Sequence, residues 1–171
     1  MRNSIILFIF VLICLPFCAR NKNIDHLQKE LIGTKNITKK IKILNDLAKE
    51  YQESDPKQMF IYAKKAVTLS PQTENLLLAG QAHQNIGVAY IIMGDYNKSL
   101  YYFTLAKDIF EKALRKKYTP NKKELEDGLA RAYGSMGIVF SEQSCISKAH
   151  YYPKVYIFKT SEKPLFLFLE K

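Results

Sequence analysis

The chain has 171 residues and a formal net charge of +10, and its length fits a single ordinary domain. Hydrophobic residues make up 47% of the sequence, which is sufficient for a core and argues against a wholly disordered chain. Glycine and proline are scarce, with 7 and 6 residues, and this scarcity argues against a β-rich protein with many tight turns.

Residues 1–19 have the pattern of a signal peptide. Arg2 provides a positive start, and the uncharged apolar run from Ile5 to Phe17 is shorter than the ~20 residues that cross a bilayer. Cleavage at the end of this segment is expected. A retained anchor, or a lipoprotein modified at Cys18, stays as an alternative. Each of these places the protein outside the cytoplasm, in the periplasm or on the outer face of a membrane.

The pattern that follows is helical. Residues 20–36 are expected to contain a lead-in helix, because Ile24, Leu27 and Leu31 recur at helical spacing before Gly33 stops the segment. Apolar periodicity predicts five further helices, over about Thr38–Glu53, Pro56–Leu69, Thr73–Met93, Tyr96–Lys117 and Lys122–Glu142. Short turns join them, so the sequence predicts an all-α array of antiparallel helical hairpins.

The expected helices contain an internal repeat. An apolar residue, a tiny residue and an aromatic residue three places further on recur as Leu47-Ala48…Tyr51, Ile86-Gly87…Tyr90 and Met136-Gly137…Phe140. A tiny residue lets two antiparallel helices approach closely, and the aromatic ring one turn later fills the space between them. Ala48, Gly87 and Gly137 are therefore each expected to be a close-contact point between paired helices.

The repeat resembles the tetratricopeptide repeat (TPR) family. The second unit carries the best match, with Ile86-Gly87, Tyr90, Gly94, Tyr96, Phe103 and Ala106. The first unit matches in Ala48, Tyr51, Ala66 and Pro71, and the third in Gly137, Phe140 and Ala149. The resemblance covers residues 37–152. It implies a solenoid of about two and a half to three hairpin units.

The third unit departs from this pattern. Pro153 falls inside the expected second helix, where a backbone N–H donor is needed. The expected tail, residues 153–171, is apolar, and it shows neither the repeat pattern nor the polar face of a capping helix. Two interpretations stay open. The chain is a truncated version of a longer TPR-containing protein, or the tail is an irregular segment that closes the last groove.

No catalytic, cofactor-binding or metal-ligating constellation is evident in the sequence. His26, His83 and His150 are far apart, and no phosphate-binding glycine loop or nucleophile motif occurs. Cys145 is the one cysteine outside the leader, and a lone cysteine forms neither an internal disulfide nor a CxxC metal site. We therefore expect a protein that is not an enzyme and needs no cofactor.

The resemblance is to exported TPR domains of bacterial sensor and regulator proteins. It implies a scaffold or extracytoplasmic sensory input module, in which the first helix of each pair lines a concave groove for a peptide or protein partner. Carried onto this chain, the groove residues would be Asn45, Lys49, Gln81, Gln84, Asn85, Val88, Arg131, Ser135 and Ile138.

The charge of +10 supports another function, electrostatic binding of nucleic acid or an anionic membrane. The lysines, however, are spread along the chain with acidic neighbours, which is typical of solvated helix faces. No nucleic-acid signature accompanies the basic clusters. Membrane contact is expected only if the leader is retained or lipidated. A truncated remnant of a longer sensor or regulator is the third alternative.

Overall fold

The computed structural model describes residues 22–142, and every regular element in that range is a helix. The first helix covers residues 22–33. The later elements are α2 (Ile37–Glu50), α3 (Pro56–Leu69), the 3₁₀ turn η1 (Ser70–Gln72), α4 (Leu76–Ile92), α5 (Tyr96–Leu114) and α6 (Lys122–Glu142). The expected leader, the tail and the second helix of the third repeat unit lie outside the described residues.

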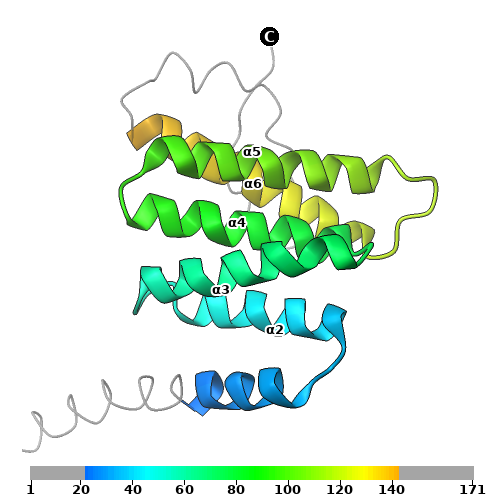
Figure 1. Ribbon diagram of the computed structural model, residues 1–171. Helices are drawn as coiled ribbons and strands as arrows, with labels where there is room; N and C mark the ends of the chain where they lie inside the picture. Colours follow the sequence, from blue (N-terminus) through cyan, green and yellow to red (C-terminus); the bar gives the residue numbers. More distant parts are fainter. Residues whose placement is uncertain (1–21, 143–171) are drawn as a thin grey trace, which may run out of the picture.

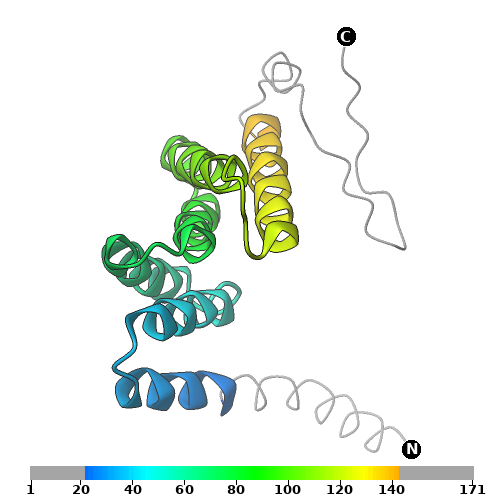
Figure 2. The same ribbon diagram turned by 90° about the vertical axis from the view of Figure 1, so that its right-hand side faces the viewer.

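The helices stack on one another in chain order, in a helical-repeat-like arrangement (Figure 1). α2, α4 and α6 follow one another along one side of the stack, and α3 and α5 lie on the other side (Figure 2). α4 is central, because it packs against α2, α3, α5 and α6. The prediction of an all-α chain of packed helices is confirmed. Within the described range, none of the helices has the length and hydropathy required to cross a bilayer.

Local capping signals set most helix starts. The Asp55 carboxylate accepts hydrogen bonds from the backbone N–H groups of Lys57 and Gln58 at 3.0 and 3.1 Å, and Pro56 occupies the first turn of α3. These are the usual means of satisfying the free donors of a first turn. Gly94, at φ 78°, turns the chain between α4 and α5, a left-handed conformation that glycine adopts without strain.

Helix ends differ modestly from the expected boundaries. α4 begins at Leu76 rather than Thr73, because the Asn75 side chain accepts a hydrogen bond from the Leu78 backbone at 3.1 Å and caps the helix there. α5 ends at Leu114, a few residues before the expected end at Lys117. These shifts leave the order and pairing of the helices unchanged.

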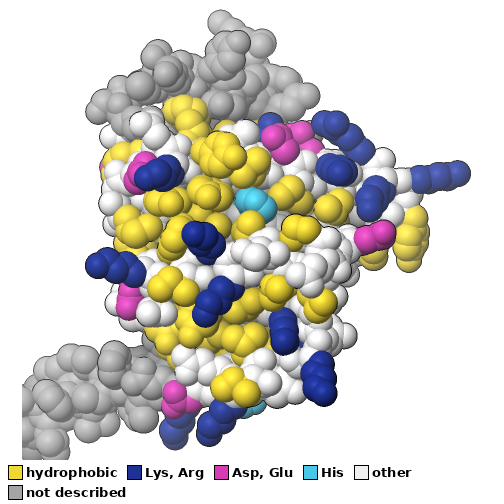
Figure 3. Space-filling view, in the orientation of Figure 1, with side chains coloured by type: hydrophobic (Ala, Val, Ile, Leu, Met, Phe, Trp, Pro, Cys, Tyr) yellow, Lys and Arg dark blue, Asp and Glu magenta, His cyan; other side chains and the backbone are white. Residues whose placement is uncertain are grey.

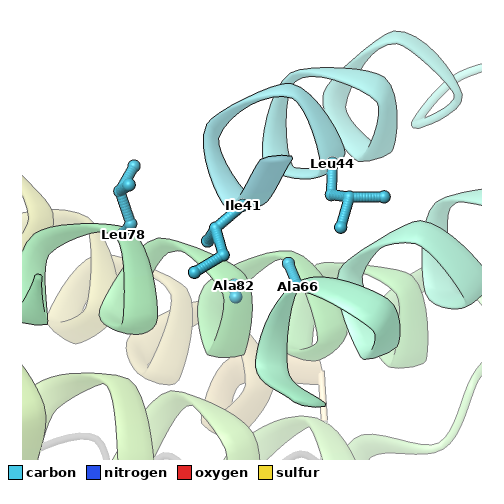
Figure 4. Packing of buried hydrophobic residues seen from close by; sticks show 5 residues of the cluster. All are labelled: Ile41, Leu44, Ala66, Leu78 and Ala82. Atoms are coloured by element: carbon cyan, nitrogen blue, oxygen red, sulfur yellow. The ribbon is translucent and has the colours of Figure 1, made fainter. Parts of the chain in front are cut away.

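One cluster of the hydrophobic core lies where α2, α3 and α4 meet. Ile41 and Leu44 of α2 pack with Ala66 of α3 and with Leu78 and Ala82 of α4. Figure 4 shows Ile41 pointing towards Ala82, while Leu44 lies over Ala66. Large side chains on one helix thus meet small ones on its neighbours, which permits the close packing typical of protein interiors.

Two of the three expected close-contact points are confirmed. Ala48 is fully buried, against Met59 and Ala63 of α3. A Cβ atom on Gly87 would lie 2.8 Å from Cε1 of Phe103 on α5. The prediction for Gly137 is not tested, because the helix expected to pair with it lies outside the described residues. Gly137 is exposed, and no described atom lies within 4 Å of the place its Cβ would take.

The tightest glycine contacts lie at positions that the repeat pattern did not single out. The Phe110 ring of α5 is fully buried between Gly80 of α4 and Gly128 of α6. A Cβ atom on Gly128 would lie 2.7 Å from Cζ of Phe110, and one on Gly80 would also overlap the ring. These two glycines therefore let three helices converge on one aromatic side chain.

Candidate functional site

The groove residues expected from the sequence lie on α2, α4 and α6, the helices that follow one another in Figure 2. α2 contributes Asn45 and Lys49, and the others come from α4 and α6. The structure therefore brings the whole expected set onto one layer of helices. Burial, however, divides this set into two groups with different roles.

The first group consists of buried amides. Asn45, Gln84 and Asn85 are 1%, 8% and 7% exposed. The Asn45 side chain donates to the Leu78 carbonyl oxygen at 3.0 Å. The Asn85 side chain donates to the Asn45 backbone oxygen at 3.3 Å. The Gln84 side chain donates to the Gly128 carbonyl oxygen at 2.8 Å. The expectation that these three residues line a groove is therefore wrong.

These amides join successive helices of the layer. Asn45 and Asn85 connect α2 to α4, and Gln84 connects α4 to α6. Buried polar groups in folded proteins are almost always hydrogen-bonded, because an unmade bond costs the full desolvation of the group. The three side chains consequently fix the spacing of the layer rather than present donors to a partner.

We expect Asn45→Ala to lower the free energy of unfolding by about 1–2 kcal/mol. The change removes the buried donor to the Leu78 carbonyl oxygen, and it removes the side-chain Oδ1 that accepts a hydrogen bond from the Asn85 amide at 3.4 Å. Lys49→Ala, on the exposed side of the same helix, is the matched control and should change stability by less than about 0.5 kcal/mol. Urea unfolding followed by circular dichroism measures both. Equal losses of stability in the two variants would contradict the structural role of the Asn45 side chain.

The second group reaches the surface to different extents. Three of its members are exposed and three are half-buried: Lys49, Arg131 and Ile138, and then Gln81, Val88 and Ser135. Ile138 is the most exposed apolar residue among them, at 55%. Polar, cationic and apolar side chains therefore remain at least partly accessible on the three helices, and we call these six residues the layer surface.

Two further residues of α2 extend the layer surface, and the expected set missed them. Lys42 is exposed and Asp46 half-buried, and both lie within two turns of Lys49 on the same helix. Partial burial raises the pKa of Asp46, while Lys49 and Lys42 favour its charged form. The four- and three-residue spacing of these charges was visible in the sequence and indicates one helix face.

The described part of the chain contains no cluster of histidine and carboxylate side chains that could bind a metal ion. His83 is half-buried, and its Nδ1 lies 2.9 Å from the Ala79 carbonyl oxygen one turn earlier on the same helix. Its ring also contacts Tyr102, with ring centroids 6.2 Å apart. Between residues 22 and 142, no three His, Cys, Asp or Glu side chains cluster as metal ligands would. His83 thus has the interhelix position expected of a packing residue.

No protein-family model matches the chain, and no curated protein matches its sequence. The function is therefore inferred from the helices, the layer surface and the repeat pattern.

Proposed function

We propose that the chain is a TPR-like, non-enzymatic scaffold or extracytoplasmic sensory input module that binds a peptide or protein segment across the layer surface. The resemblance of the repeat units to TPR sequences supports this proposal. The location outside the cytoplasm depends on the leader pattern in residues 1–19. No cofactor or metal is part of the proposal.

One observation carries the proposal most directly: three successive helices of one layer each expose side chains suited to a peptide. Lys49 on α2 and Arg131 on α6 supply cations, which pair with carboxylates of a partner. Gln81 on α4 supplies an amide that both donates to and accepts from a peptide backbone. Ile138 supplies an exposed apolar contact. This combination of functional groups resembles a protein-binding surface more than a site for chemistry.

The charge distribution favours a protein partner over nucleic acid. The two densest basic clusters are Lys39, Lys40 and Lys42, and Arg115, Lys116 and Lys117. One cation in each cluster pairs with a carboxylate of its own chain. Lys39 Nζ lies 2.8 Å from a Glu30 oxygen, and Arg115 Nη2 lies 3.3 Å from a Glu111 oxygen. Cations that already have carboxylate partners contribute less to a phosphate-binding surface, so the net charge alone does not favour nucleic-acid binding.

A peptide selection tests the proposal. Peptides selected from a display library on the immobilised protein are expected to lose about tenfold in affinity for the double variant Lys49→Ala, Arg131→Ala, since each removed cation contributes to the pairing. The matched control is Lys116→Ala, Lys117→Ala, which removes the same charge from two exposed residues outside the layer surface. Binding to the control variant should stay within about twofold of the unaltered protein.

Two results would contradict the proposal. Equal losses in both double variants would indicate unspecific electrostatics instead of a defined surface. Tight binding of a duplex oligonucleotide at physiological salt, with a steep salt dependence, would instead favour the nucleic-acid alternative.

A further inference from the structure

A second, independent surface lies where the first helix, α2 and α3 meet. A groove with a volume of ≈ 610 Å³ opens there, and we call it the α3 groove. Its lining residues come from these three helices: Leu31, Lys40, Leu44, Phe60, Ile61, Lys64, Lys65, Thr68 and Leu69. The α3 groove and the layer surface have only helix α2 in common, and no residue belongs to both, so the role of the groove does not depend on the proposed function.

The floor and one wall of the α3 groove are apolar. Leu31 of the first helix, Leu44 of α2 and Leu69 of α3 contribute to its lining, and Leu44 is only 3% exposed. Phe60 and Ile61 line it from the start of α3, and Ile61 is 39% exposed. A hollow of this composition loses unfavourable contact with water when an apolar side chain enters it.

The charged lining residues of the α3 groove are all lysines. Lys40, Lys64 and Lys65 line it, and no acidic residue does. No described carboxylate lies within ion-pair distance of these three lysines. Lys64 Nζ lies 5.9 Å from the centroid of the Phe60 ring, so cation and apolar surface are adjacent. Figure 3 shows the face of the molecule on which α3 lies in Figure 1. Dark blue lysine and arginine side chains lie among yellow hydrophobic ones there, and magenta carboxylates lie mostly towards the edges of this face.

The spacing of the α3 residues gives the groove a direction. Phe60, Lys64 and Thr68 form one row with four-residue spacing, and Ile61, Lys65 and Leu69 form the next. Both rows run along the helix axis. At a rise of 1.5 Å per residue they extend for about 13 Å. This length matches between two and three turns of a helix laid beside α3.

From this geometry we propose that the α3 groove binds an acidic amphipathic helix of a partner protein. Apolar side chains at i, i+3/i+4 and i+7 of that helix enter between the first helix and α3, which is a recurrent mode of helix recognition. Carboxylates beside the apolar row pair with Lys40, Lys64 and Lys65. A second copy of this chain suits the groove less well, because its net charge of +10 brings like charges together.

A defined probe tests this proposal on the full chain. The probe is a fluorescein-labelled helical peptide of about 12 residues, with leucines on one face and glutamates beside them. A second peptide carries lysine in place of every glutamate. Fluorescence anisotropy measures the dissociation constant of each peptide, and circular dichroism confirms that every protein variant keeps its helix content.

The acidic peptide should bind at least about tenfold more tightly than the lysine peptide, because only its carboxylates have the opposite charge to the three lysines of the α3 groove. Lys64→Glu with Lys65→Glu should weaken the acidic peptide by at least about tenfold, through repulsion in place of attraction. Lys116→Glu with Lys117→Glu makes the same change in net charge away from the groove and should leave binding within about threefold. Ile61→Ser should weaken the acidic peptide by about fivefold, because it removes part of the apolar wall.

Three outcomes would overturn the proposal. Equal effects of the two double charge reversals would show that only the overall charge matters. No effect of Ile61→Ser would show that the apolar wall is not used. A concentration-dependent dimer that Lys64→Glu with Lys65→Glu abolishes, measured by analytical ultracentrifugation, would assign the α3 groove to a second copy of the chain.

Discussion

Phe110→Ala is expected to lower the free energy of unfolding by about 3–5 kcal/mol, the usual cost of removing a buried aromatic ring from a core. The Phe110 side chain is fully buried, and its ring lies against Gly80 of α4 and Gly128 of α6. Leu125 and Leu129 of α6 complete its surroundings. Truncation therefore loosens three helices together, and this cost is a large share of the 5–15 kcal/mol that typically stabilises a domain.

Urea unfolding followed by circular dichroism measures this loss. Tyr101→Ala is the matched control, since Tyr101 is an aromatic residue of the same helix that is 59% exposed, and its truncation should cost less than about 1 kcal/mol. Similar losses in the two variants would contradict the central position of Phe110.

Gly80→Leu is expected to destabilise the protein by about 3 kcal/mol, at the upper end of the usual cost of overpacking. The added Cβ would overlap the Phe110 ring, which Gly128 confines on its other side. Leucine has a higher intrinsic helix propensity than glycine, so a loss of stability here cannot come from helix propensity.

Gly134→Leu is the control for this prediction. Gly134 lies within α6, and no described atom lies within 4 Å of the place its Cβ would take. Leucine there should raise stability by up to about 1 kcal/mol, the usual difference in helix propensity. The double variant Gly80→Leu, Phe110→Ala should be more stable than the sum of the single effects predicts, because leucine then enters the vacated space. Additive effects would show that the two residues are not in contact.

Local signals in the sequence predicted the helices well. Asp55-Pro56 and Gly94-Asp95 mark chain reversals with capping groups, and these signals act within one helical turn, independently of the remaining structure. The start of α4 was placed too early. Thr73 and Asn75 are both capping types, and in the structure Thr73 ends the turn η1 while Asn75 caps α4.

The expected site was predicted only in part. Polar residues at the right helical phase were assigned to a groove. Lys49 and Arg131 are exposed, and their place in a binding groove stays a prediction. The assignment did not hold for Asn45, Gln84 and Asn85, whose amides bond neighbouring helices. A sequence shows that an amide is polar, but the distance to the next helix decides whether its partner is water or a buried carbonyl group.

The sequence by itself determined that the chain forms antiparallel helices joined by short turns, and where most of these helices begin and end. It also determined that Ala48 and Gly87 lie where two helices approach closely. Tertiary structure alone decided that Gly80 and Gly128 meet an aromatic ring, and that apolar surface and lysines gather in the α3 groove. The physical reason is the range of the interactions. Caps and helix periodicity act between residues a few positions apart, whereas close contacts and grooves depend on how separate helices cross.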